Sequence, residues 1–179
     1  MTGQAAEYAV PDIGGEGPGP ELPGRADRPS PEGESMIIAI DPGNEQSAYV
    51  MWDGVKIWGC AIEPNWMVSQ VIKKEAYNAT RCVIEMIASY GMPVGKEVFE
   101  TCVWIGRFAE CSFAFNLLYR KDVKMHLCNS MRAKDSNIRQ ALIDRFGAPG
   151  TKKNPGLTYG LKKDLWSAFA TGVTWVDQN

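Results

Sequence analysis

The chain has 179 residues, with 19 Lys and Arg against 21 Asp and Glu, a formal net charge of −2, five cysteines and one histidine. No stretch reaches the roughly 18 consecutive apolar residues that a membrane-spanning helix needs. The N-terminus has no basic segment followed by an apolar one, which is the pattern of a secretion signal. With no Cys-x-x-Cys pair, the cysteines do not predict a zinc site. We therefore expect a cytoplasmic protein with reduced thiols and no membrane partner.

The first 35 residues differ from the rest of the chain. They contain seven acidic and two basic residues, six of the 11 prolines and seven of the 18 glycines. This composition cannot bury enough apolar surface to offset the entropy lost on ordering. We predict a disordered acidic tail over residues 1–35, with Met36 as a candidate natural start, and a folded domain over residues 36–179. The domain then carries a net charge of +3, and an excess of eight positive charges lies within residues 120–163, which favours a polyanionic partner.

Strands dominate the first part of the domain. Residues 37–40 are a continuous apolar run, typical of a strand covered on both faces, and Asp-Pro-Gly-Asn ends that strand with turn chemistry. Residues 47–52 and 55–62 are predicted to pair as a hairpin around Asp53-Gly54. A helix is predicted from Asn65, a plausible N-cap, to about Asn78.

Helices dominate the second part. We predict a buried strand at 81–87, a long apolar helix at about 95–115, a short strand at 124–128, a helix at 133–146, a basic loop rich in Pro and Gly at 148–160, and a last helix at about 161–176. Three meandering strands followed by helix-strand crossovers resemble the ribonuclease H-like fold. The expected fold class is α/β, with a mixed five-stranded sheet, a three-strand antiparallel meander plus parallel strands, flanked by helices.

Three acidic residues lie where acids are locally unexpected. Asp41 ends the first apolar strand, Glu85 lies inside the apolar strand 81–87, and Asp164 falls in the first turn of the last predicted helix. A carboxylate in a buried strand is costly unless it is paired or bound to metal. If the two strands are neighbours, Asp41 and Glu85 stand side by side, and the last helix brings Asp164 to the same rim. Three carboxylates suit Mg²⁺ or Mn²⁺. Taken singly, Asp41 is also explained as a turn residue and Asp164 as a helix-dipole acid.

Residues 36–179 resemble the RuvC family of Holliday junction resolvases, particularly its short phage-type members. The segments that carry the resemblance are Ile-Ala-Ile-Asp41-Pro-Gly, Val-Ile-Glu85 and Lys-Asp164-Leu-Trp-Ser-Ala-Phe-Ala. The resemblance implies a homodimeric endonuclease that cuts Holliday junctions or other branched DNA with Mg²⁺ or Mn²⁺, two ions per site, held by Asp41, Glu85 and Asp164. It also implies that Lys124 and Lys134 correspond to the family's lysines, with Lys134 or Lys163 assisting catalysis by stabilising charge on the scissile phosphate. If phage-encoded, the protein would act in the cytoplasm of a bacterial host.

The chain departs from the family pattern at one position. The family usually carries two acids, or a His and an Asp, three residues apart on the last helix, whereas Asp164 is followed three residues later by Ser167. Because positions i and i+3 share a helix face, Ser167 takes the place of the missing acid and supplies no charge. This departure puts the activity, and not the fold, in question.

Basic residues around the last helix are expected to grip DNA phosphates. The candidates are Arg120, Lys121, Lys124, Arg132, Lys134, Arg139, Lys152, Lys153, Lys162 and Lys163. The apolar helix at 95–115 is expected to pack against a second copy in a dimer.

Two alternative functions stay open: a catalytically weak or inactive protein that binds branched DNA, and a ribonuclease H that acts on RNA–DNA hybrids. A fragment of a sugar-kinase or actin-type ATPase is disfavoured, because that fold needs two such domains and a much longer chain.

Overall fold

The computed structural model describes residues 36–76, 80–89, 91 and 93–179, so the tail predicted over residues 1–35 lies outside the described residues. The described residues form a five-stranded sheet in the order β3-β2-β1-β4-β5. Its strands are β1 (Ile37–Asp41), β2 (Gln46–Trp52), β3 (Ile57–Pro64), β4 (Arg81–Met86) and β5 (Phe115–Tyr119). The pairs β1–β2 and β2–β3 are antiparallel, whereas β1–β4 and β4–β5 are parallel. The predicted mixed sheet, a meander followed by parallel strands, is therefore confirmed.

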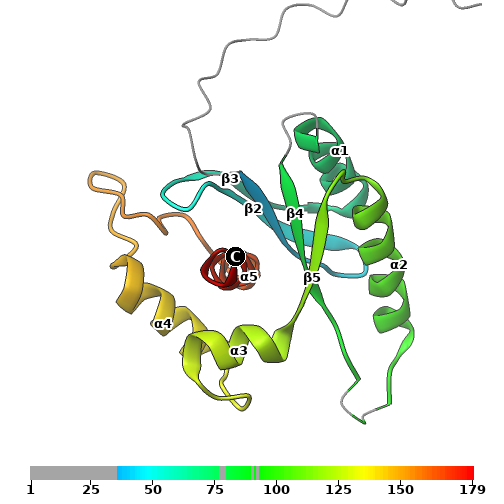
Figure 1. Cartoon of the computed structure of the whole chain (residues 1–179). Coiled ribbons are helices and arrows are strands. Elements are labelled where there is room, and N and C mark those ends of the chain that lie inside the picture. Colours follow the sequence, from blue (N-terminus) through cyan, green and yellow to red (C-terminus); the bar gives the residue numbers. More distant parts are fainter. Residues whose placement is uncertain (1–35, 77–79, 90, 92) are drawn as a thin grey trace, which may run out of the picture. The chain divides into compact units, whose positions relative to one another are not determined.

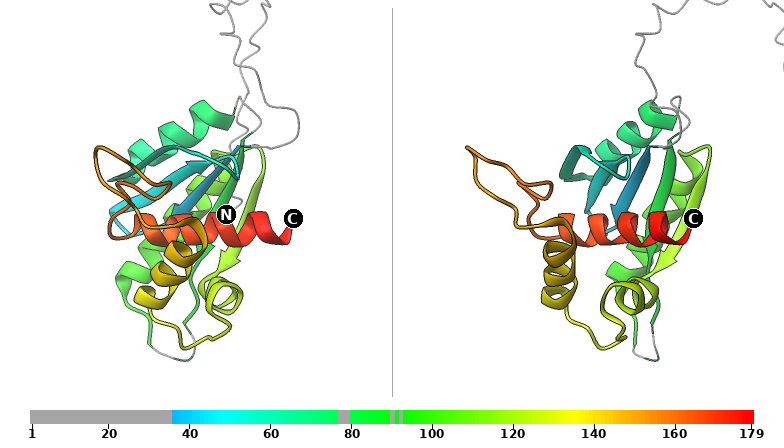
Figure 2. Two further views of the ribbon diagram at one scale, coloured as in Figure 1. Left: turned by 90° about the vertical axis from the view of Figure 1, so that its left-hand side faces the viewer. Right: turned by 60° about the vertical axis from the view of Figure 1, so that its left-hand side comes forward.

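Helices cover both faces of the sheet (Figure 1). One face carries α1 (Asn65–Ala76) and α2 (Lys96–Glu110), and the other carries α3 (Arg120–Cys128), α4 (Asp135–Phe146) and α5 (Leu165–Gln178). Helix α5 crosses the sheet directly against β1 and β2, as Figure 2 shows. Within the described residues, no helix is both long and apolar enough to cross a membrane.

The alternation of side chains along β1 decides which way its last residue points. Ile38 and Ile40 belong to the core on the α1 and α2 side, whereas Ile37 and Ala39 belong to the core on the α5 side. All four are almost completely buried. Because successive side chains of a strand point to opposite faces, Asp41 projects toward α5.

Close packing of α5 on β1 depends on a glycine. A Cβ at Gly172 would lie 3.0 Å from the Ala39 Cβ and 3.2 Å from the Ile37 Cδ1. Glycine normally weakens a helix interior by about 1 kcal/mol relative to alanine. At this position it lets the helix backbone approach the strand, and this approach brings the polar face of α5 to the end of β1.

The stretch between β4 and α4 differs from the sequence prediction. The predicted helix at 95–115 ends at Glu110 and is followed by β5, and the predicted strand at 124–128 is part of α3. Val123, Met125 and Leu127 alternate as in a strand, but Val123 is fully buried and Met125 is exposed, as expected for a helix with one buried face. The fifth strand exists, but it is an earlier segment than predicted.

Two helix boundaries also differ. The last helix begins at Leu165 and not near Leu161, which leaves Asp164 just outside it as the N-cap residue. Helix α4 begins at Asp135, two residues later than predicted. Helix α1 ends at Ala76, and its predicted end near Asn78 lies outside the described residues.

Candidate metal and DNA site

Asp41 and Glu85 lie side by side at the ends of two parallel neighbouring strands. Ile40 of β1 pairs with Ile84 of β4, so the next residue on each strand is an acid. Both acids face α5, because Glu85 alternates with Val83, a residue of the core on that side. The residue Glu85 is only 7% exposed. The predicted pairing of these two carboxylates is a consequence of the strand order.

Burial and mutual repulsion keep these carboxyl groups from ionising easily. Burial, the nearby Glu85 charge and the more distant Asp164 charge raise the pKa of Asp41 from 3.8 to about 7, although Arg120 and a hydrogen bond from Ser167 partly oppose the rise. Burial also raises the pKa of Glu85, and here Arg120 and Thr171 oppose it. A carboxyl group with a pKa near neutrality next to a second carboxyl group is typical of functional sites.

The polar face of α5 contacts both acids. The Thr171 hydroxyl lies 3.2 Å from Glu85 Oε2 and donates a hydrogen bond to it, while Ser167, one turn earlier, donates to Asp41. The spacing of four residues places both hydroxyls on one face of the helix. Ser167 therefore occupies the position, predicted from the sequence, that faces the acid pair. Thr171 was missed, although its spacing from Ser167 was a usable signal.

A buried network fixes the turn that follows Asp41. The Asn65 side chain donates to the Gly43 carbonyl at 2.9 Å and accepts from the Ser47 hydroxyl at 2.6 Å, and the Gly43 N–H donates to Ser47 Oγ at 3.1 Å. A Cβ at Gly43 would lie 2.3 Å from the Gln46 carbonyl oxygen, so this position requires glycine. The Asp-Pro-Gly segment is therefore a rigid support for Asp41.

Arg120 contacts one member of the acid pair, Glu85. Its Nη1 lies 2.9 Å from Glu85 Oε2 and its Nη2 lies 2.5 Å from Asp135 Oδ1. We predicted that Arg120 grips DNA phosphates, but the structure pairs it with protein carboxylates. No local pattern signals this pairing, because Arg120, Glu85 and Asp135 come from three separate elements.

A cleft of about 640 Å³ opens between α4 and the start of α5; Arg120, the ion-pair partner of Glu85, lines it, but Asp41 and Glu85 do not. Its wall contains Arg120, Asp135, Lys163, Asp164 and Ser167, together with Arg139 and Trp166. The Arg139 guanidinium lies over the Trp166 ring at 5.0 Å. Asp164, the third predicted acid, is exposed at the rim of this cleft. Lys163 has a left-handed backbone (φ 48°), an uncommon conformation for a residue other than glycine.

The predicted DNA-binding cations lie on the α3–α5 side of the chain. Three of them, Arg120, Arg139 and Lys163, line the cleft, and Lys121 is exposed on α3. Lys134 is the exposed N-cap of α4, where its N–H donates to Asn137 Oδ1 at 2.9 Å. Lys124 lies on α3 and is partly buried, so it is not the strand residue that we predicted. The others are exposed loop residues: Arg132, Lys152, Lys153 and Lys162.

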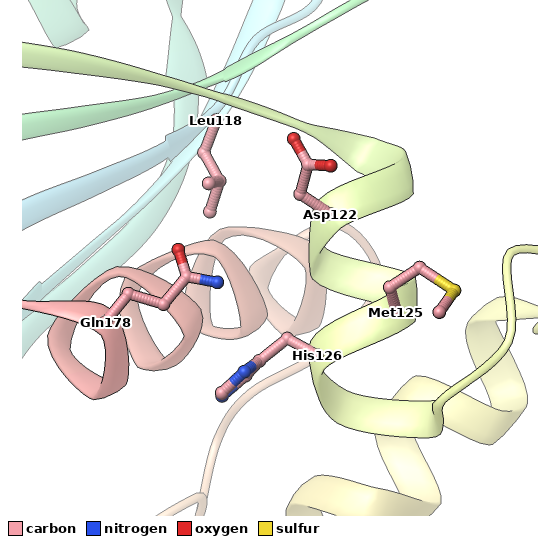
Figure 3. A pocket seen from close by; sticks show the side chains of 5 residues that line it. All are labelled: Leu118, Asp122, Met125, His126 and Gln178. Atoms are coloured by element: carbon pink, nitrogen blue, oxygen red, sulfur yellow. The ribbon is translucent and has the colours of Figure 1, made fainter.

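A second, smaller pocket lies elsewhere. It has a volume of about 400 Å³ and is lined by Leu118 of β5, by Asp122, Met125 and His126 of α3, and by Gln178 of α5 (Figure 3). Beside it, His126 Nε2 lies 2.6 Å from Asp177 Oδ2, and Arg145 of α4 contacts the same carboxylate. These contacts join α3, α4 and α5, and the acid pair has no part in this pocket.

The donor set of the acid pair fits a hard divalent cation. Mg²⁺ is commonly held by one or two carboxylates, with waters and substrate phosphates completing its coordination. A divalent ion would also relieve the repulsion that raises the pKa of Asp41. Among the described residues, however, no three Asp, Glu, His or Cys side chains converge closely enough to hold an ion together. Asp41 and Glu85 therefore fit an ion as a pair, with Asp164 at the rim.

The sheet order and the helices on both faces define an α/β protein with a ribonuclease H-like fold. No protein-family model and no curated protein sequence matches the chain. Among solved structures, RuvC of Thermus thermophilus is similar with a TM-score of 0.51 at 14% identity, covering 78% of this chain and 92% of that chain. T. thermophilus RuvC in complex with a Holliday junction substrate has a TM-score of 0.49 at 12% identity and the same coverage. The chain has a RuvC-like fold, as the sequence predicted.

Proposed function

We propose that the protein is a divalent-metal-dependent endodeoxyribonuclease that hydrolyses phosphodiester bonds in Holliday junctions or other branched DNA. The observation that carries this proposal is the pair of Asp41, half-buried, and Glu85, buried, at adjacent strand ends, facing α5. The RuvC-like fold and the sequence motifs around Asp41, Glu85 and Asp164 support it. All five cysteines are free thiols, which is compatible with the cytoplasmic location that we predict. That location and the phage-type assignment rest on the sequence.

The residues of the site have separable roles. Asp41 and Glu85 would hold Mg²⁺ or Mn²⁺, with Asp164 approaching from the rim. Such an ion, when bound, activates water and stabilises charge on the phosphate. Ser167 and Thr171 orient the two carboxylates through their hydroxyl groups. Lys134 keeps its proposed catalytic role only if the DNA reaches the start of α4.

Cations near the cleft would hold the DNA backbone. Lys163 and Arg139 line the cleft, and phosphate contacts position a nucleic acid without reading its sequence. The exposed cations Arg132, Lys152, Lys153 and Lys162 would extend this contact, and Lys124 would contribute from α3. Removing one cation that binds a phosphate should lower the slope of log affinity against log salt by about one. Lys163→Gln and Arg139→Gln should show this reduction, whereas Lys73→Gln, on the opposite side of the sheet, should not.

A homodimer would supply two active sites for two strands. The side of the sheet that carries α2 is incompletely covered. Phe99 and Val103 of α2 are 61% and 54% exposed, and the apolar row Phe115, Leu117 and Tyr119 of β5 is also exposed. We expect this surface to pair with a second copy. Light scattering should give a dimer for the wild type and a monomer for Val103→Glu, and Val55→Glu in the β2–β3 turn should stay dimeric.

The activity is tested with a synthetic four-way junction, a flap, an RNA–DNA hybrid and a matched duplex, each with Mg²⁺ or Mn²⁺. We expect nicking of the branched substrates, and a loss of at least about 100-fold in Asp41→Asn and Glu85→Gln. Equal nicking by these variants would refute the proposal. Preference for the hybrid would indicate a ribonuclease H.

One observation favours a second candidate, a branched-DNA-binding protein with weak or no activity. Ser167 supplies no charge where the resemblance implies an acid, and three carboxylates do not converge in the described residues. Tight, metal-independent binding of the junction without nicking would support this candidate. Recovery of nicking in Ser167→Asp would then identify the serine as the cause.

A further inference from the structure

We propose that the Arg120 guanidinium serves as the second cation of the acid site, so that the site takes one divalent ion instead of two. This inference deepens the proposed function and rests on it. It concerns how the chain itself balances the charge of Asp41 and Glu85.

Arg120 is held in place from two sides. It contacts Glu85 of β4 through Nη1 and Asp135 of α4 through Nη2, and its side chain is 21% exposed. It is also the first residue of α3, which begins directly after the last residue of β5. A guanidinium keeps its charge throughout the accessible pH range. The site therefore contains one permanent positive charge at a fixed position.

The charges balance with one divalent ion. Asp41, Glu85 and Asp164 together supply three negative charges when ionised, and one divalent ion plus Arg120 supplies three positive charges. Asp135 adds a fourth acid, but its side chain is 81% exposed and contacts Nη2 of Arg120, whereas Nη1 contacts Glu85. Asp164 is also exposed, and it enters the count because it is a proposed metal ligand. Ser167 adds no charge, so the site has one negative charge fewer than a site with four acids and two divalent ions. Replacing one divalent ion by the singly charged Arg120 removes one positive charge and restores the balance.

The contacts of the two Glu85 oxygen atoms also favour a single divalent ion. Arg120 and Thr171 both contact Oε2, at 2.9 and 3.2 Å. Oε1 is then the oxygen through which Glu85 would reach an ion shared with Asp41. A second ion beside Oε2 would have to displace a charge-assisted hydrogen bond, which is among the stronger polar contacts in proteins.

Arg120 also faces the space where a substrate would lie. It lines the cleft together with Lys163 and Arg139, so a phosphodiester placed there would meet a fixed guanidinium. Donors that are already oriented before the reaction stabilise developing negative charge without reorganisation. Glu85 and Asp135 act as positioning residues for this group.

The experiment counts Mn²⁺ ions on the full chain without DNA, by equilibrium dialysis and by electron paramagnetic resonance. We expect one ion per chain in the wild type, with the spectrum of an isolated Mn²⁺. The double variant Arg120→Gln with Ser167→Asp removes the cation and restores the acid, and should bind two ions with an exchange-coupled spectrum. The matched control, Arg107→Gln with Ser167→Asp, removes an arginine from α2 on the other side of the sheet and should still bind one ion.

The outcomes separate this inference from the proposed function. Two coupled ions in the wild type, together with metal-dependent nicking, would overturn the inference and leave the nuclease intact. A single ion in a folded double variant would also overturn it. If no variant binds Mn²⁺ and no nicking occurs, the metal site and this inference both fail. Because Arg120→Gln removes the only charged partner described for the buried Glu85 and leaves it the Thr171 hydroxyl, thermal unfolding checks folding. Arg120→Lys keeps the charge and should bind one ion.

Discussion

Substitution of Asp41 by Asn should stabilise the metal-free protein at alkaline pH. The pKa of Asp41 rises from 3.8 to about 7, first because of burial and then because of Glu85. The folded state therefore binds the proton more tightly than the unfolded state does. The contribution of Asp41 to the free energy of unfolding is therefore fully present below about pH 4, and it is lost as the pH rises through about 7. Asn keeps the size of the side chain but removes this titration.

The magnitude follows from the change in pKa. A rise from 3.8 to about 7 corresponds to at most about 4 kcal/mol between the protonated and ionised forms. In the presence of a chelator, the wild type should lose up to this amount of unfolding free energy between pH 4 and pH 8 relative to Asp41→Asn. At pH 8 the variant should therefore be the more stable protein, although it lacks a proposed metal ligand.

The assay is urea denaturation at pH 4.5, 6, 7 and 8, with a chelator and then with Mg²⁺. Added Mg²⁺ should reverse the order at pH 8, because only the wild type gains from binding the ion. Asp53→Asn is a suitable control. Burial raises the pKa of Asp53, but hydrogen bonds from Lys56, Trp58 and Val55 together lower it below its usual value. Asp53→Asn should therefore give no gain in stability at pH 8. If Asp41→Asn is less stable than the wild type at pH 8 without metal, the reasoning about the acid pair is wrong.

Three further changes test the support of the site. Gly172→Val should cost about 1–3 kcal/mol by pushing α5 away from β1, and calorimetry should show a smaller loss for Gly106→Val, whose Cβ would meet nothing within 4 Å. Asn65→Ala should cost about 2 kcal/mol in urea unfolding, because it leaves partners of a buried hydrogen-bond network unsatisfied, and nicking should fall as the turn after β1 loosens. Asp177→Asn should destabilise the protein at pH 7 but not near pH 3. The hydrogen bond from Arg145 lowers the pKa of Asp177, so the stabilisation by the ionised carboxylate is lost as the pH falls. Thermal unfolding at both pH values tests this prediction.

The first four strands could be predicted because their signals are local. The apolar run before Asp41, the Asp53-Gly54 turn and the apolar strand around Glu85 each lie within a few residues. The Asp53 carboxylate accepts hydrogen bonds from the Val55 and Lys56 N–H groups, which is the turn chemistry that the sequence indicated. The neighbourhood of Asp41 and Glu85 then followed from the strand order.

The second half was harder to predict for physical reasons. The boundary between α2 and β5 contains neither Gly nor Pro, so an apolar segment continues across a change from helix to strand. The role of Arg120 depends on contacts between residues 35 positions and 15 positions apart. Local sequence patterns carry no information about such contacts. They could predict that Asp41 and Glu85 lie on neighbouring strands, but not which cation the fold brings to Glu85.

The direct junction between β5 and α3 has a consequence for how this protein can change. Tyr119 ends the strand and Arg120 begins the helix, so no loop residue separates the sheet from the guanidinium. One inserted residue at this point would turn the start of α3 by about 100° around its axis and carry the charge away from Glu85. Related chains that keep Arg120 should therefore tolerate substitutions around this junction but not a change in its length.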